Sequence, residues 1–321
     1  MGAGLIAPKK VLHITHRHTQ SSARTLPNLK TMKLSFVAIA AILATTQLSR
    51  AEIPIKTGDK VAFLGDSITQ AGQANPGGYV QLIGSGLAAN GVKIEIIGAG
   101  ISGHKSNDML QRLERDVLSK KPQWMTLSCG VNDVWHGAKG VALEDYKKNI
   151  TEIVDKAQAA GIKVVILTST MIREDQANAE NQKLVSYNDF LRTLAKDKKC
   201  LLADLNAEMQ AALAVAAKTQ TKSAKGTYLT TDGVHMALAG NQMMAVGVLK
   251  GLGLNASELT KASEAWLNIP NISSVTAKTN LTLRQTKQLE AVAAARKVSV
   301  DSLLNEELSK VVESLIKPAT P

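Results

Sequence analysis

Val61-Ala-Phe-Leu-Gly-Asp-Ser-Ile-Thr-Gln70 is the stretch that decides the fold. Its apolar run, residues 61–64, predicts a short buried strand that stops at the tight turn Gly65-Asp66-Ser67. In open α/β sheets, ligands bind beyond the carboxyl ends of the strands. Ser67 would lie there, with a helix N-terminus close behind it. The residue is therefore either a nucleophile or the cap of the following helix.

Beyond this stretch, short runs rich in β-forming residues alternate with helical stretches as far as residue 253. We expect strands at 61–64, 93–97, 124–128, 163–168 and 201–203, and helices at 79–90, 106–120, 143–160, 181–197, 207–218 and 237–252. Strands that alternate with helices form right-handed crossovers on a parallel sheet. The sequence thus predicts one three-layer α/β/α domain over residues 52–253.

The positive charge of the chain is concentrated at its N-terminus. Residues 1–51 hold seven Lys or Arg and no Asp or Glu, whereas the remainder holds 31 basic and 27 acidic residues. The formal charge of +11 therefore falls to +4 beyond residue 51. This balance does not indicate that the folded part binds nucleic acid.

The same N-terminal segment has the pattern of a secretory leader. Met32-Lys33 supplies one positive charge, residues 34–44 form an apolar run, and Ala51 ends a small-residue cleavage site. The run is too short for a transmembrane helix. We expect translation to start at Met32 rather than Met1, with residues 1–31 as an upstream extension, and cleavage near Ala51. The mature chain would be periplasmic or extracellular, without stable membrane insertion. An uncleaved amphipathic targeting peptide is the alternative.

Residues 254–321 differ from the α/β part. Ile269-Pro-Asn-Ile-Ser-Ser274 marks a break, and helical stretches follow at 283–297 and 300–316. They carry no residues that suggest chemistry. Their pattern faintly resembles a ribbon-helix-helix module. We give this resemblance little weight, because the protein is expected to be exported. We favour a helical hairpin that packs on the main domain or mediates self-association; the oligomeric state stays open.

The two cysteines, Cys129 and Cys200, are expected to be buried free thiols. Export would permit a disulfide, but the two residues lie at the ends of predicted strands that a third strand should separate. Their spacing does not suit a metal site.

Four blocks rich in glycine and polar residues follow predicted strands or lie in late loops. They are Gly65-Asp66-Ser67-Ile68-Thr69, Gly98-Ala-Gly-Ile-Ser-Gly103, Gly130-Val131-Asn132-Asp133 and Thr231-Asp232-Gly233-Val234-His235. The first three come at the carboxyl ends of strands, where sites in such sheets form. We therefore expect the blocks to build one site.

The residue types in these blocks suit acyl transfer. Ser67 needs a base to remove its proton, and the imidazole of His235 titrates near neutrality. Asp232 could orient that imidazole and stabilise its charged form. An oxyanion needs hydrogen-bond donors, which the N–H groups of Ser67 and Gly103 and the amide of Asn132 could supply.

Over residues 61–247, these blocks and their order resemble the SGNH hydrolases, also called the GDSL esterase/lipase family. The resemblance implies a flavodoxin-like sheet of order 2-1-3-4-5 and no cofactor. By motif position it assigns Ser67, Asp232 and His235 as the triad, and Ser67, Gly103 and Asn132 as the oxyanion hole. One departure is Gly98, where relatives often have Asn; we expect it to affect a local turn more than the chemistry.

Other residues near these blocks have weaker assignments. Trp135, His136 and His104 are candidate substrate contacts, although a packing role suits them as well. Asp66 and Asp133 are expected to be structural. Three histidines without a cluster of carboxylates do not favour a metal site, so none is predicted.

These observations predict an exported serine esterase that works through an acyl-enzyme. Export, the absence of a long apolar lid and the similarity to bacterial members acting on acetylated sugars favour removal of O-acetyl groups from a polysaccharide. A lysophospholipase or thioesterase is the first alternative. A non-catalytic glycan-binding or adhesion protein, with the C-terminal helices as the partner site, is the second.

Overall fold

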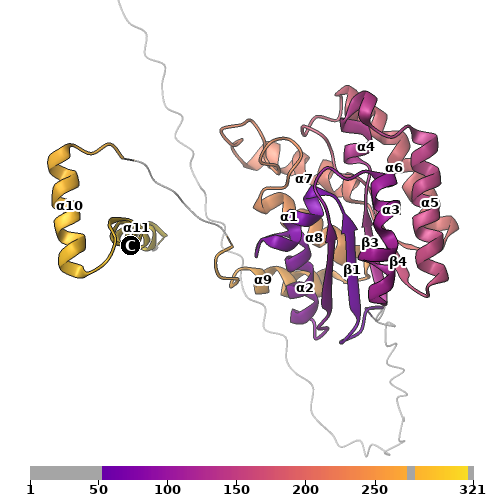
Figure 1. Cartoon of the computed structure of the whole chain (residues 1–321), viewed down its shortest axis with the longest axis horizontal. Helices are drawn as coiled ribbons and strands as arrows, with labels where there is room; N and C mark the ends of the chain where they lie inside the picture. The colour runs from indigo at the N-terminus through magenta and orange to yellow at the C-terminus, as the bar shows by residue number, and fades with distance from the viewer. Residues whose placement is uncertain (1–52, 273–278, 317–321) are drawn as a thin grey trace, which may run out of the picture. The chain divides into compact units, whose positions relative to one another are not determined.

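Five parallel strands lie at the centre of the fold, in the order β2-β1-β3-β4-β5 (Figure 1). The structure, a computed structural model, describes residues 53–272 and 279–316. The strands are β1 Lys60–Gly65, β2 Glu95–Gly100, β3 Trp124–Ser128, β4 Lys163–Leu167 and β5 Leu201–Ala203. This order confirms the fold that the family resemblance implied. The predicted leader, 1–51, lies outside the described residues.

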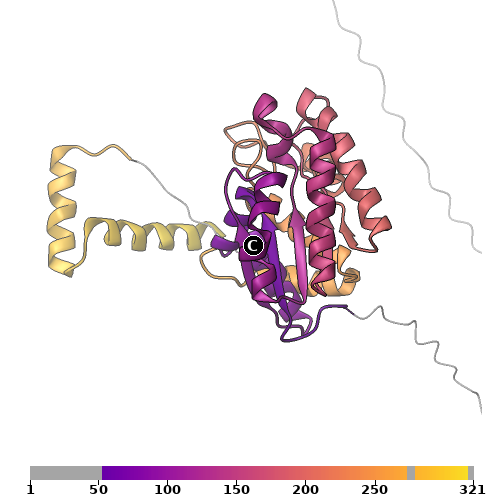
Figure 2. The same cartoon turned by 45° about the vertical axis from the view of Figure 1, so that its right-hand side comes forward.

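Helices cover both faces of the sheet (Figure 2). One group comprises α2, α7, α8 and α9, in which α2 packs on α8 and α9, and α7 packs on α8. The other group comprises α3, α5 and α6. The helices are α1 Ser67–Ala74, α2 Tyr79–Ala89, α3 Ser106–Asp116, α4 Val131–Trp135, α5 Leu143–Ala159, α6 Ala179–Asp197, α7 Leu205–Thr219, α8 Leu238–Gly251, α9 Ala256–Trp266, α10 Leu283–Arg296 and α11 Val300–Ile316.

The central strands are buried on both sides, as their continuous apolar runs predict. Val61, Ala62, Phe63 and Leu64 of β1 are each at most 2% exposed. The core around them is mainly aliphatic, because the chain has only 3% aromatic residues. Such a core holds β1 rigidly and so fixes the position of the turn that follows it.

Strand β2 is displaced from its predicted position. We expected residues 93–97, but the strand runs from Glu95 to Gly100, and Gly100 pairs with Gly65 of β1. Gly98, expected in a turn, is therefore inside the strand. A Cβ atom at Gly100 would lie 2.3 Å from the backbone nitrogen of Gln70, so a side chain there would collide with α1. Close backbone approach explains why glycine occurs in this strand.

Helix α9 extends the packed body beyond the expected boundary at residue 253. Its Ala262 and Trp266 belong to the main hydrophobic core. The indole Nε1 of Trp266 donates a hydrogen bond of 2.9 Å to the carbonyl of Leu82 in α2. A capping box between Asn255 and Glu258 starts the helix.

Both cysteines are free thiols, as predicted. Cys129 is buried, but Cys200 is only half-buried, contrary to the expectation. Cys200 directly precedes β5, an edge strand with a neighbour on one side only. That position leaves one side of the residue open to solvent.

Helices α10 and α11 form a two-helix unit, residues 282–316, here called the hairpin; its helices cross rather than lie side by side (Figure 2). A capping box between Thr282 and Gln285 starts α10, and Lys297 ends it in the left-handed conformation. Among the described residues, no helix has the length and apolarity needed to cross a membrane.

Candidate active site

Ser67 is the first residue of α1 and follows the carboxyl end of β1. Asp66 caps this helix, because its Oδ1 accepts a hydrogen bond of 2.9 Å from the N–H of Ile68. Burial raises the pKa of the Asp66 carboxyl to about 6; the Ile68 N–H opposes this rise and nearby Asp133 adds to it. Asp66 therefore builds the turn that presents Ser67.

The three residues of the predicted triad lie in one hydrogen-bonded series. Nε2 of His235 is 2.9 Å from Oγ of Ser67, and Nδ1 of the same ring is 2.7 Å from Oδ2 of Asp232. Ser67 is separated from the other two by more than 160 positions in the sequence. The fold thus brings together groups that can pass a proton from a hydroxyl to an imidazole.

Asp232 is held by the loop on which it lies. Its Oδ1 accepts hydrogen bonds from the N–H groups of Val234 and His235, at 2.9 and 2.8 Å. Partial burial would raise the pKa of this carboxyl, but the bonds from the His235 ring and from the two N–H groups outweigh it and lower the pKa to about 2. Asp232 is therefore charged throughout the neutral range and can stabilise an imidazolium.

Three neighbouring strands, β2, β1 and β3, deliver the predicted oxyanion donors. Gly103 lies in the loop after β2 with φ of +77°, and Asn132 lies at the start of α4, after β3. The N–H groups of Ser67 and Gly103 donate to no acceptor within the described part of the chain. One amide hydrogen of Asn132 is bonded to the carbonyl of His104, at 3.1 Å. The second remains for a ligand.

A buried arginine supports this part of the site. Arg112 of α3 donates to the carbonyls of Gly65 and Ala99, each at 2.8 Å, and so joins the ends of β1 and β2. Its Nε donates to Nδ1 of His104 at 3.1 Å. His104 is therefore neutral with its proton on Nε2, and partial burial, followed by the charge of Arg112, lowers its pKa. Through the His104 carbonyl, the same chain of contacts reaches Asn132.

Glu174 anchors the loop that precedes Asp232. Its carboxylate accepts hydrogen bonds from the N–H groups of three consecutive residues, Tyr228, Leu229 and Thr230, at 2.7–2.8 Å. The hydroxyl of Thr230 adds a fourth at 2.7 Å and accepts one from the N–H of Gly233. Glu174 has φ of +53°, a strained conformation for a residue other than glycine. These bonds compensate for the strain.

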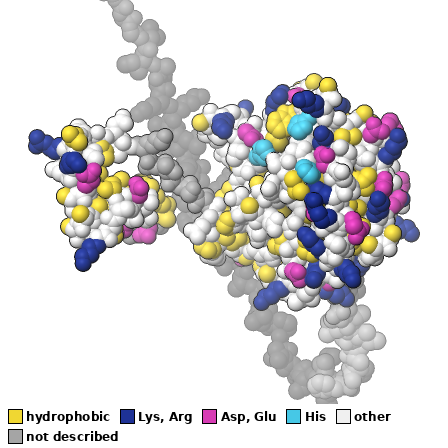
Figure 3. All heavy atoms as spheres, viewed as in Figure 1, with side chains coloured by type: hydrophobic (Ala, Val, Ile, Leu, Met, Phe, Trp, Pro, Cys, Tyr) yellow, Lys and Arg dark blue, Asp and Glu magenta, His cyan; other side chains and the backbone are white. Residues whose placement is uncertain are grey.

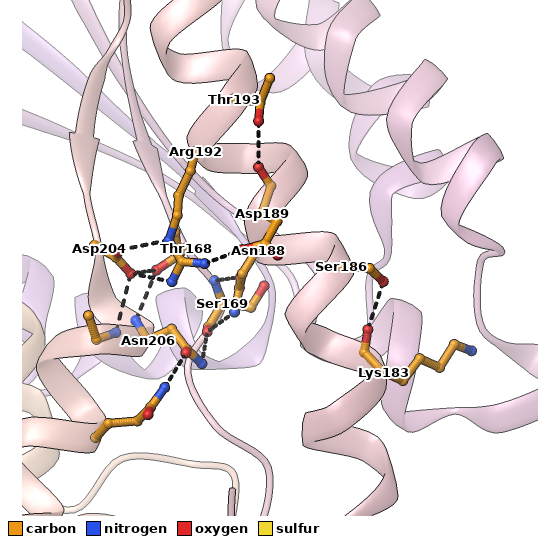
Figure 4. A network of polar contacts seen from close by, with 12 residues as sticks. Thr168, Ser169, Lys183, Ser186, Asn188, Asp189, Arg192, Thr193, Asp204 and Asn206 are labelled. Carbon is orange, nitrogen blue, oxygen red and sulfur yellow. Dashed lines mark hydrogen bonds and ion pairs between the residues drawn. The ribbon is translucent and has the colours of Figure 1, made fainter.

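The turn after β3 is anchored by a polar network. The hydroxyl of Ser169 donates to the carbonyl of Cys129 at 2.7 Å. Figure 4 shows how Asn188 and Asn206 bind the Ser169 backbone. Thr168 and Arg192 both donate to Asp204. The network thus joins the ends of β4 and β5 to the turn that carries Asn132.

Trp135 and His136 lie at the end of α4, three and four residues after Asn132. Both side chains are exposed, and their ring centres are 6.0 Å apart. Figure 3 shows the histidine side chains of the described part gathered on one face of the main body. The described residues contain no group of three or more His, Cys, Asp or Glu side chains that could hold a metal ion.

Two supporting residues were not found from the sequence. Arg112 lies on an amphipathic helix, where an arginine usually indicates the solvent-exposed face. Glu174 lies in a loop about 60 positions before His235, and no spacing rule connects the two. An isolated charged residue beside a predicted site was the only available signal.

The fold and this hydrogen-bonded series together indicate the class of protein. A parallel α/β sheet that presents Ser, His and Asp together is typical of hydrolases that act through a serine. A family model, the GDSL-like lipase/acylhydrolase family, matches residues 63–243. The chain belongs to this family and is a carboxylic ester hydrolase.

Several proteins similar to this chain are named as esterases. An acetylxylan esterase of Geobacillus stearothermophilus is 28% identical over 218 residues, which cover 62% of this chain and 96% of the relative. Esterase TesA of Pseudomonas aeruginosa is 31% identical over 128 residues, 40% of this chain and 59% of the relative. The crystal structure of the acetyl xylan esterase AlAXEase superposes with a TM-score of 0.54 at 37% identity, covering 60% of this chain and 98% of that structure.

Proposed function

We propose that the protein removes O-acetyl groups from carbohydrate through an acyl-enzyme formed on Ser67. The observation that carries the proposal is the series Ser67–His235–Asp232, with distances of 2.9 and 2.7 Å. The similarity to two acetylxylan esterases supports the choice of substrate class.

In the first half-reaction, Oγ of Ser67 attacks the acetyl carbonyl carbon while Nε2 of His235 takes the hydroxyl proton. The N–H groups of Ser67 and Gly103 and the amide of Asn132 hold the oxyanion of the tetrahedral intermediate. The bond from the carbonyl carbon to the sugar oxygen then breaks, and His235 gives its proton to that oxygen. Ser67 is left acetylated.

In the second half-reaction, a water molecule attacks the acetyl-enzyme and His235 takes a proton from it. Collapse of the second tetrahedral intermediate returns the proton to Ser67 and releases acetate. Asp232 stays ionised and stabilises the imidazolium in both halves.

The solvent exposure of the site supports a small acyl group on a large alcohol. The side chains of His235 and Asp232 are 36% and 42% exposed, so a polymer chain could reach them. A long acyl chain would need an apolar channel beside Ser67. A cavity of about 640 Å³ does have an apolar lining, but it lies between α1, α2 and β2 and includes none of the proposed catalytic residues.

Trp135 supports the carbohydrate assignment. The residue is 37% exposed and follows Asn132 by three residues on the same short helix. An exposed aromatic face beside the donors could hold the apolar face of a sugar ring. His136 and His104 complete the set of proposed substrate contacts.

A chain-length series of p-nitrophenyl esters tests the acyl preference. We expect the highest kcat/KM for acetate and a steady fall toward octanoate. A maximum at long chains would favour the lysophospholipase or thioesterase alternative and contradict the proposal. Release of acetate from a panel of acetylated glycans would then identify the sugar, and no turnover of any ester would favour a binding protein.

Export is part of the same proposal. The signal-peptide pattern from Met32 to Ala51 supports it, as does the likeness to a Bacillus subtilis lipoprotein, 29% identical over 122 residues. N-terminal sequencing of the native protein should begin at or near Glu52. A sequence that begins at Met1 would contradict it.

A further inference from the structure

The α10–α11 hairpin is well specified locally. The Thr282–Gln285 capping box starts α10, and the N–H of Val298 bonds to the carbonyl of Ala293 where α10 ends. Ser299 then starts α11, because its hydroxyl accepts a hydrogen bond of 3.0 Å from the N–H of Ser302. Both ends of α10 and the start of α11 are thus defined, which is typical of a folded unit rather than of a linker.

The hairpin nevertheless lacks a core of its own. Within residues 282–316, only Ala293 and Leu303 are buried. Segments shorter than about 40 residues usually need a disulfide, a metal or association with another chain to stay folded. Both cysteines of the protein lie elsewhere, at 129 and 200. The described residues also include no metal-binding cluster. Packing against the main body or against another chain is therefore the remaining source of stability.

Helix α11 carries an apolar face suited to association. Leu304, Leu308, Val311 and Leu315 are spaced by four, three and four residues, so they line one side of the helix. Leu304 is 41% exposed and Leu315 is 77% exposed. Figure 3 shows apolar side chains over much of the hairpin surface. Further exposed apolar residues of the hairpin are Leu283, Val292, Val298, Val312 and Ile316.

Opposite charges of the two helices already meet within one chain, where Arg296 and Glu307 are 3.7 Å apart, and they favour a second copy as the partner. Helix α10 carries the basic residues Arg284, Lys287 and Arg296 against one acidic residue, Glu290. Helix α11 has the opposite balance, with one basic residue and four acidic ones: Lys310 against Asp301, Glu306, Glu307 and Glu313. A two-fold axis between two hairpins can place each α10 against the α11 of the other copy. Opposite charges then meet at both contacts.

We infer that the α10–α11 hairpin is a self-association element, through which two copies of this chain form a four-helix interface. The interface buries the face made by Leu304, Leu308, Val311 and Leu315. Basic α10 of one copy borders acidic α11 of the other, which selects the register and the partner. The inference does not depend on the proposed ester hydrolysis.

Sedimentation equilibrium of the full chain tests the inference. We expect a mass near twice the 34.1 kDa of one chain. Leu304→Glu combined with Val311→Glu should weaken association by at least about 100-fold, because it places charges in the centre of the interface. The control, Ser302→Glu combined with Ser309→Glu, adds the same charge to the opposite side of α11 and should stay dimeric. Esterase activity and the thermal midpoint of the main body report whether each variant is folded.

A charge exchange tests the pairing of α10 with α11. One variant carries Arg284→Glu and Lys287→Glu, which gives both of its helices more acidic than basic residues; the other carries Glu306→Lys and Glu313→Lys, which gives both helices more basic than acidic residues. Each alone should be monomeric, and a mixture should form a one-to-one dimer. A monomeric wild type, as expected if the hairpin packs on its own catalytic body, overturns the inference. A dimer that the Leu304 and Val311 changes leave intact, or a mixture that stays monomeric, also overturns it.

Discussion

Arg112 donates a hydrogen bond of 3.1 Å from its Nε to Nδ1 of His104, while its two terminal nitrogens bind the carbonyls of Ala99 and Gly65. One guanidinium therefore connects the ends of two strands with the loop that holds Asn132. The planar fork of arginine is the group that can meet acceptors in these directions; a lysine ammonium is not.

Arg112→Lys should lower both stability and turnover. The lysine leaves buried carbonyl acceptors unpaired, which should reduce the free energy of unfolding by about 2–4 kcal/mol. It also frees His104 and so displaces the Asn132 amide. Urea unfolding and kcat on p-nitrophenyl acetate measure the two effects. Arg115→Lys is the matched control: both arginines bind Asp116, Arg112 at 2.9 Å and Arg115 at 2.7 Å, but Arg115 is exposed. Equal effects of the two changes would contradict this account.

Glu174→Gln should reduce kcat with little change in KM. The carboxylate now accepts hydrogen bonds from three N–H groups. In the glutamine variant the amide NH₂ would face one of these N–H groups, donor against donor, so the loop before Asp232 should shift. A misplacement of about 1 Å can lower a catalytic rate by about 100-fold. Steady-state kinetics, with the thermal midpoint as a record of folding, measure this effect.

Glu180→Gln is the control for this experiment. Glu180 lies near the same loop and pairs with exposed Arg173 at 2.9 Å, but it does not bind the Asp232 loop. It should keep kcat within about twofold, as surface changes usually do. A Glu174→Gln variant with the kcat of the control would show that Glu174 does not position the triad.

Asp66 should make the protein less stable as the pH rises from about 4 to 6. Its pKa is about 6 in the folded chain and 3.8 ordinarily, so in this window the unfolded chain loses a proton that the folded chain keeps. The stabilising contribution is fully present below pH 3.8 and is lost as the pH passes 6. Two pKa units correspond to about 3 kcal/mol.

Asp66→Asn removes this dependence, because the amide oxygen can still cap Ile68 but does not ionise. Urea unfolding of both proteins from pH 4 to 7 measures the difference in the free energy of unfolding. The wild type should lose up to about 3 kcal/mol relative to the variant across this range. A difference that does not change with pH would show that the Asp66 carboxyl is not shifted upward.

Trp135→Ala should separate carbohydrate from small esters. Loss of the aromatic face should raise KM for an acetylated oligosaccharide about 10-fold, which corresponds to about 1.4 kcal/mol. The kcat/KM for p-nitrophenyl acetate should change by no more than about twofold, since that ester has no sugar to hold. Val215→Ala, a change at an exposed apolar residue of α7, is the control. An equal loss on both substrates would argue for a packing role of Trp135.

Much of the fold could be predicted from local patterns. The apolar run of β1 and the alternation of strands and helices were enough to predict the three-layer arrangement. The strand order came from the motif resemblance. The end of β2 was predicted too early, because its glycines indicate a turn. They occur in the strand because the backbone there approaches α1 closely. Helices α1 and α4 begin within the motif blocks, where glycine and polar residues indicate turns. Helix α9 follows a glycine stop and its burial depends on Trp266 reaching Leu82.

The candidate site was predictable as far as its motifs extend. Ser67, Asp232 and His235 belong to blocks with fixed internal spacing, and the structure brings their side chains together at hydrogen-bonding distance. Their roles stay predictions. Arg112 and Glu174 act through contacts between distant segments, and such contacts leave no local pattern. The half-buried position of Cys200 likewise depends on which strand forms the edge of the sheet.

The release of acetate from acetylated xylan by the wild type and by Ser67→Ala tests the central claim most directly. We predict steady acetate release by the wild type and a loss of at least about 10⁴-fold in kcat for the variant, with the same thermal midpoint. Equal release by both proteins would show that Ser67 is not the nucleophile. No release by folded wild type, together with turnover of long-chain esters, would contradict the assignment to carbohydrate acetyl groups.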